Sequence, residues 1–75
     1  MNYKEIKEKL SKQVSSVKYF NKQTFDIIMK DRETANKIYE EGGNVQEFYK
    51  NCETSKTKFY TENGGAYCQL LSILA

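Results

Sequence analysis

The sequence predicts an all-α fold, a small antiparallel up-down bundle of three long helices followed by one short C-terminal helix. Apolar residues recur at steps of three and four along most of the chain, as they do on one face of a helix. The chain has no proline, so no helix has a forced break. Glycine pairs at 42–43 and 64–65 follow two of the periodic blocks and end them. Short connections between helices favour consecutive antiparallel packing.

The first predicted helix covers residues 2–20. Its opposite face carries lysine and glutamate at the favourable i,i+4 spacing, as in the pair Glu5 and Lys9. Valine and serine at 14–17 lower the helix propensity, but the apolar spacing continues through them. The apolar stripe consists of Tyr3, Ile6, Leu10, Val14, Val17 and Phe20.

The second predicted helix covers residues 24–41. Asn21 and Thr24 are its two candidate N-caps, and the glycines at 42–43 supply its C-terminal stop. Its apolar face is formed by Phe25, Ile28, Ala35, Ile38 and Tyr39.

The third predicted helix covers residues 45–62. Asn44 followed by Glu47 resembles a capping box, with asparagine in place of the usual serine or threonine. The stripe then steps by three and four residues through Val45, Phe48, Cys52, Ser55 and Phe59.

The last predicted helix is short, residues 66–75, and too short to be stable alone in water. It therefore docks on the core of its own domain or on another subunit. A rival interpretation makes residues 56–71 a β-hairpin, because Asn63-Gly64 favours tight turns.

A chain of 75 residues forms one domain, residues 1–75, and buries barely enough apolar surface to be stable. Oligomerisation is one way in which small bundles gain further burial. We therefore expect a homo-oligomer in which the apolar face of the last helix takes part. The candidate interface residues are Tyr67, Leu70, Leu71, Ile73 and Leu74.

The sequence offers little to catalysis. Histidine is absent, which excludes histidine-based nucleophilic pairs and histidine metal sites within this chain. Neither glycine pair has the spacing of a phosphate-binding loop. We expect no catalytic residue, no cofactor and no metal, and hence no enzyme.

The two cysteines are too few to define a disulfide framework. We expect Cys52 to be buried on the apolar stripe and Cys68 to be more accessible. No signal peptide or transmembrane segment can be fitted, so we expect a cytoplasmic protein.

Charge is unevenly distributed although the net charge is only +2. We expect the lysines of the first helix to form the solvated face of an amphipathic helix, and we do not expect nucleic acid as the main partner. The alternative is that this basic face binds nucleic acid weakly and without sequence preference, while the remaining chain is balanced. Its candidate residues are Lys4, Lys7, Lys9, Lys12 and Lys18.

The segments 20–25, 43–49 and 55–60 together resemble the helical region of phasins, small proteins that coat polyhydroxyalkanoate granules. In both, a helix start that ends in Glu-Phe is followed a few turns later by a lysine and an aromatic residue. The resemblance covers about residues 18–62. It implies self-association and an apolar helical face that lies on a hydrophobic surface, and it implies no active site.

Two further functions fit the same residues. One is a small phage-type or mobile-element protein that binds and modulates a host protein. The other is the weak nucleic-acid binder described above. The first expectation remains a self-associating amphipathic protein that coats or binds an apolar surface or partner.

Overall fold

The computed structural model describes residues 2–15 and 17–75, and every regular element within them is helical. The elements are α1 (Tyr3–Gln13), α2 (Lys22–Glu40), α3 (Val45–Asn51), the 3₁₀-helix η1 (Thr54–Lys56), α4 (Lys58–Glu62) and α5 (Gly64–Leu74). The predicted fold class is therefore correct, and the β-hairpin over 56–71 is not formed. The arrangement differs from three long helices, because only α2 reaches that length.

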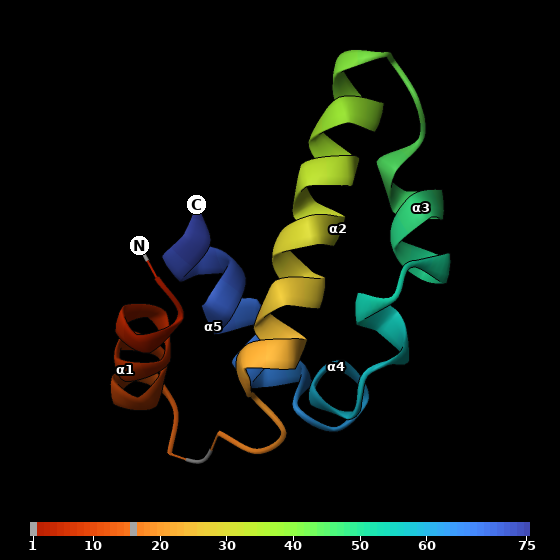
Figure 1. Cartoon of the computed structure of the whole chain (residues 1–75). Helices are drawn as coiled ribbons and strands as arrows, with labels where there is room; N and C mark the ends of the chain where they lie inside the picture. The colour runs from red at the N-terminus through yellow and green to blue at the C-terminus, as the bar shows by residue number, and fades with distance from the viewer. Residues whose placement is uncertain (1, 16) are drawn as a thin grey trace.

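Figure 1 shows α2 running through the middle of the molecule, with α3 descending beside its second half. α1 packs against α5, and α2 packs against both α3 and η1. α4 contacts η1 and α5, and so leads the chain back beneath α2 to α5.

The core joins side chains from both ends of the chain. Phe59 and Leu70 are fully buried together with Ile6 and Leu10 of α1. Tyr67 of α5 belongs to the same cluster. Its ring packs edge-on against the ring of Phe59, with 6.4 Å between the ring centres. α5 thus completes the core that α1 begins.

α1 ends at Gln13, and the prediction of one helix over 2–20 is wrong. Val14 is already extended, with φ −127° and ψ 146°, in line with the low helix propensity of the run that it begins. Val14 and Val17 still pack against the core from beyond the end of α1, and Phe20 is buried in that core. Ser16, which the predicted helix included, lies outside the described residues, as does Met1.

The connection into α2 is held by side chains. Tyr19 adopts a left-handed conformation with φ 62°, which costs energy for a residue with a side chain. Its carbonyl accepts a hydrogen bond from the hydroxyl of Thr24 at 3.3 Å, and the carbonyl of Lys18 accepts one from the amide of Asn63 at 3.0 Å. The cap of α2 is Asn21, whose side chain accepts from the backbone N–H of Thr24 at 2.9 Å.

The predicted third helix is divided into α3, η1 and α4. Its start is as predicted, since the Asn44 side chain accepts from the backbone N–H of Glu47 at 3.1 Å. Its continuity fails at Cys52, which is extended with ψ 166°. Beyond that point hydroxyl groups bond to the backbone: Ser55 donates to the Cys52 carbonyl at 2.8 Å, and Thr57 caps α4. Such bonds compete with the helical ladder.

Candidate binding surface

An open pocket of about 430 Å³ lies between α2 and the C-terminal end of α5. Four of its five lining residues come from two turns of α2, at the spacing that places side chains on one side of a helix. The fifth comes from the last turn of α5. The lining consists of Met29, Arg32, Glu33, Asn36 and Leu74.

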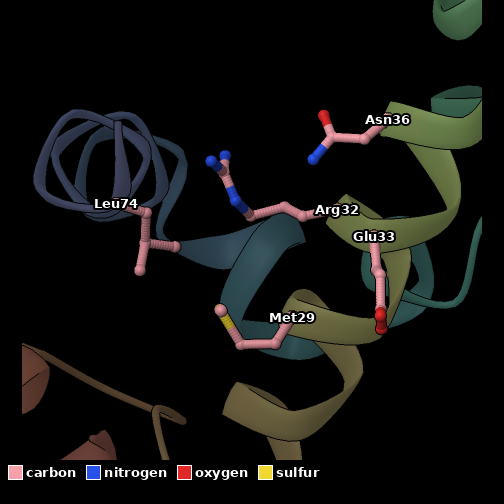
Figure 2. A pocket seen from close by; sticks show the side chains of 5 residues that line it. All are labelled: Met29, Arg32, Glu33, Asn36 and Leu74. Atoms are coloured by element: carbon pink, nitrogen blue, oxygen red, sulfur yellow. The ribbon is translucent and has the colours of Figure 1, made fainter. Parts of the chain in front are cut away.

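Arg32 is the single arginine of the chain and is half-buried in this pocket. Figure 2 shows its side chain extending from α2 toward Leu74. Among the residues that the structure describes, it has no hydrogen-bond or ion-pair partner. A guanidinium carries five N–H donors in a planar fork. The pocket therefore contains a set of unused donors beside apolar groups.

The charges of the pocket lining cancel. Arg32 and Glu33 contribute one positive and one negative charge, and their consecutive side chains point in different directions (Figure 2). The end of α5 adds the partial negative charge of its last carbonyl groups. The five lining side chains therefore carry no net charge.

The positive charge of Arg32 also affects the pKa of two tyrosines on neighbouring elements, Tyr49 and Tyr67. Burial raises the pKa of Tyr67 to about 12, and it also raises the pKa of Tyr49. In both cases the Arg32 guanidinium acts in the opposite direction and lowers the pKa. Arg32 is thus close enough to α3 and α5 to stabilise negative charge there.

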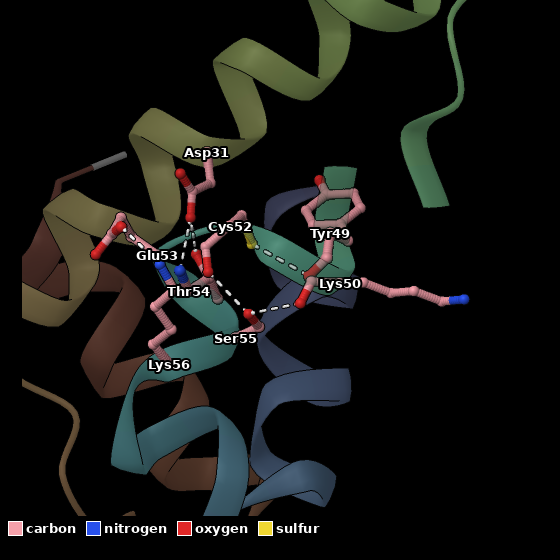
Figure 3. Close-up of polar contacts among 8 residues, drawn as sticks. All are labelled: Asp31, Tyr49, Lys50, Cys52, Glu53, Thr54, Ser55 and Lys56. Carbon is pink, nitrogen blue, oxygen red and sulfur yellow. Dashed lines mark hydrogen bonds and ion pairs between the residues drawn. The ribbon is translucent and has the colours of Figure 1, made fainter. Parts of the chain in front are cut away.

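Asp31 precedes Arg32 in α2 and anchors this helix to η1. Asp31 is 8% exposed, and its carboxylate accepts hydrogen bonds from the backbone N–H of Thr54 at 2.7 Å and from the Thr54 hydroxyl at 2.5 Å (Figure 3). Because Asp31 is directed at η1, the next side chain along α2 is directed toward α5. Asp31 was not among the residues predicted from the sequence, although its position three residues after Ile28 and four before Ala35 places it on the buried stripe.

The candidate interface residues of α5 have separate locations. Tyr67 and Leu70 are buried in the core of the chain itself, with exposed fractions of 8% and 0%. Leu71, Ile73 and Leu74 are half-buried and pack against that core. Of the five, Leu74 alone lines the pocket.

The candidate basic face is dispersed. Lys4, Lys7, Lys9 and Lys12 are exposed on α1, but their spacing distributes them around its solvent side, with Glu5 and Glu8 between them. Glu8 forms an exposed ion pair with Lys12 at 3.9 Å, and the ammonium of Lys7 lies 5.7 Å from the centre of the Tyr3 ring. Lys18 lies beyond α1 altogether, because that helix ends at Gln13.

The reactive groups are placed as the sequence predicts. Cys52 is buried, and its thiol donates to the carbonyl of Tyr49 at 3.4 Å, whereas Cys68 is exposed. Within the described residues, no group of three or more Cys, Asp or Glu side chains could hold a metal ion.

In the part of the chain that the structure describes, none of the helices combines the length and the apolar character that crossing a membrane requires. Comparisons with family models, with curated proteins and with solved structures find no match to this chain. The likeness to phasins therefore stays a prediction.

Proposed function

We propose that this chain is a non-enzymatic binding protein that contacts another protein through the surface between α2 and the end of α5. The observation that carries the proposal is Arg32, half-buried and without a partner among the described residues, beside the partly exposed apolar groups of Met29 and Leu74. Arginine and methionine are enriched at protein interfaces, where a partner satisfies the guanidinium and covers the apolar groups.

The distribution of apolar groups favours a discrete protein partner over a flat apolar surface. Adsorption on a granule gains free energy in proportion to continuous apolar area, about 25 cal/mol per Å². In the described chain, the faces of α1 and α5 that could supply this area pack against each other. The large apolar residues with the most exposure are Tyr19, Met29, Tyr39 and Tyr60, which are scattered over the molecule. A phasin-like coat and a cytoplasmic location remain predictions of the sequence.

Self-association is the second candidate, and α3 favours it. None of the residues of α3 is fully buried, although Val45 and Phe48 are apolar and half-buried. Tyr39, near the turn between α2 and α3, is 77% exposed. A second copy packed on the α2–α3 pair would cover these groups.

Site-specific photo-crosslinking tests the proposal. A benzophenone amino acid at Lys37, an exposed position one turn after Glu33, reports on the rim of the pocket without lying in its lining. The matched control position is Glu8, exposed on α1. In the cells that naturally make the protein, we expect one discrete adduct from position 37 and none from position 8. The same adducts from both positions, or none from position 37, would contradict the proposal.

A further inference from the structure

We infer that the pocket between α2 and α5 binds a carboxylate that has an apolar group beside it, contributed by the partner as an aspartate or glutamate side chain. The inference rests on the proposed function and names the chemistry of the partner's contact. It follows from three features of the pocket: its donors, its charge and its walls.

The donors match a carboxylate. The guanidinium of Arg32 presents parallel N–H groups that fit the two oxygens of a carboxylate, and such paired, charge-assisted hydrogen bonds are stronger than neutral ones. Asn36 lies one turn further along the same side of α2, and its amide also has no partner among the described residues. Its NH₂ group can donate to a lone pair that Arg32 leaves free.

The charge selects a monoanion. Glu33 already balances Arg32 within the lining, and the carbonyl end of α5 is partially negative. A phosphate group carries close to two negative charges at neutral pH and would meet repulsion from both. A carboxylate carries one negative charge, spread over two oxygens that can each accept a hydrogen bond from the Arg32 guanidinium.

The walls require an apolar neighbour. Met29 is 37% exposed, and Leu74 faces it across the pocket from the last turn of α5 (Figure 2). A volume of about 430 Å³ is at the lower end of the ~300–1,000 Å³ typical of ligand pockets, and it suits one or two side chains rather than a large ligand. An acidic residue followed by an apolar one would fill both parts of the pocket.

The intact chain can be titrated with small probes and followed by ¹H–¹⁵N NMR. The probe is sodium hexanoate, and its controls are hexan-1-ol, hexylammonium chloride and sodium acetate. We expect hexanoate to shift the Arg32 Nε–H and Asn36 amide resonances saturably in the millimolar range, and the controls at least five-fold less at equal concentration. An equal response to hexanol, or no response to hexanoate, would overturn the inference.

Variants locate the effect. Arg32→Gln should abolish the response, and Arg32→Lys should weaken it several-fold, because an ammonium keeps the charge but loses the planar fork. Lys30→Gln is the matched control, since it removes one positive charge from the exposed side of α2 roughly opposite Arg32, outside the pocket lining, and should leave hexanoate binding unchanged. Should Arg32→Gln fail to fold, the unaltered chain still tests the inference: hexanoate should shift the Arg32 and Asn36 resonances, and hexylammonium should not.

A second experiment distinguishes a carboxylate on a protein partner from a free carboxylate, by using peptides as probes. Acetyl-Leu-Glu-Leu-amide should produce the same shifts as hexanoate, and acetyl-Leu-Gln-Leu-amide should not. A crosslink from position 37 without hexanoate binding would overturn this inference and leave the proposed function intact. Hexanoate binding without a crosslinked partner would contradict the proposed function and assign the pocket to a free carboxylate instead.

Discussion

The carboxylate of Asp31 accepts two hydrogen bonds from Thr54, at 2.7 Å from the backbone N–H and at 2.5 Å from the hydroxyl, although the two residues are 23 positions apart. This contact ties the middle of α2 to η1, at the place where the predicted third helix is interrupted. Both residues are buried, with exposed fractions of 8% and 1%. The same contact fixes the rotation of α2 and therefore the direction in which Arg32 leaves it.

Loss of this contact should destabilise the fold. Asp31→Ala leaves a buried backbone N–H without an acceptor, which costs about 1–3 kcal/mol of unfolding free energy. Thr54→Val removes only the hydroxyl bond and should cost less, about 1 kcal/mol. Urea denaturation followed by circular dichroism measures the free energy of unfolding of both variants.

The double variant provides the control. If the two side chains act through each other, the cost of Asp31→Ala plus Thr54→Val is less than the sum of the single costs. Strictly additive values would show that Asp31 and Thr54 stabilise the chain independently.

The predicted helix over 2–20 shows how periodicity can mislead. Val14, Val17 and Phe20 continue the spacing of Ile6 and Leu10, yet they reach the same core from positions beyond the end of α1. An apolar residue every third or fourth position shows that the chain returns to the core regularly, and it does not require a helix. The low propensity of residues 14–17 was the better guide to where α1 ends.

The start of the predicted third helix could be read from the sequence, and its interruption could not. Asn44 and Glu47 identify the cap because capping is local. The break at Cys52 is accompanied by local hydroxyl bonds of Ser55 and Thr57, and Thr54 beyond it also donates to Asp31, which is distant in sequence and is reached only once α2 is in place. The pocket was missed for the same reason, since it needs α5 to lie beside α2.

Truncation on α5 should separate core residues from surface residues. Leu70→Ala removes a side chain with no exposure and should cost about 2–5 kcal/mol. Leu74→Ala, at the half-buried rim of the pocket, should cost about 1 kcal/mol or less. Thermal and urea unfolding of the two variants give the comparison, and equal losses would contradict the burial of Leu70 in the chain's own core.

Alkaline pH should destabilise the protein through Tyr67. Its pKa is raised to about 12 by burial, from about 10 in the unfolded chain, so the folded state retains this proton at pH values where the unfolded state loses it. Stability should therefore fall as the pH rises from about 10 to about 12. The raised pKa of Tyr49 adds to the loss in the same direction.

Tyr67→Phe tests this pH dependence. Phenylalanine keeps the buried ring and has no proton to lose, so the decline above pH ~10 should become shallower. At neutral pH the variant should be nearly as stable as the unaltered protein, because the Tyr67 hydroxyl has no hydrogen bond with the described residues. A decline of unchanged steepness would show that other groups control the alkaline transition.

Two glycine substitutions should have opposite effects. Gly42 ends α2 with φ +79°, so Gly42→Ala places a side chain in the left-handed region and should cost about 1–2 kcal/mol. Gly65 lies within α5, and a methyl group there would meet no atom within 4 Å. Gly65→Ala should therefore stabilise by about 0.4–1 kcal/mol through reduced freedom of the unfolded chain. Thermal denaturation distinguishes the signs, and destabilisation by both would contradict the helical placement of Gly65.

In the proposed function, α5 completes the core of its own chain and leaves the α2–α5 surface for a different protein. The most direct test is the absolute mass in solution, measured by light scattering behind a sizing column at low and at high salt. We expect a monomer of 8.8 kDa under both conditions. A defined oligomer at both salt concentrations that dissociates on Leu74→Asp would show that copies of the chain cover each other's α2–α5 surface, and it would contradict the claim.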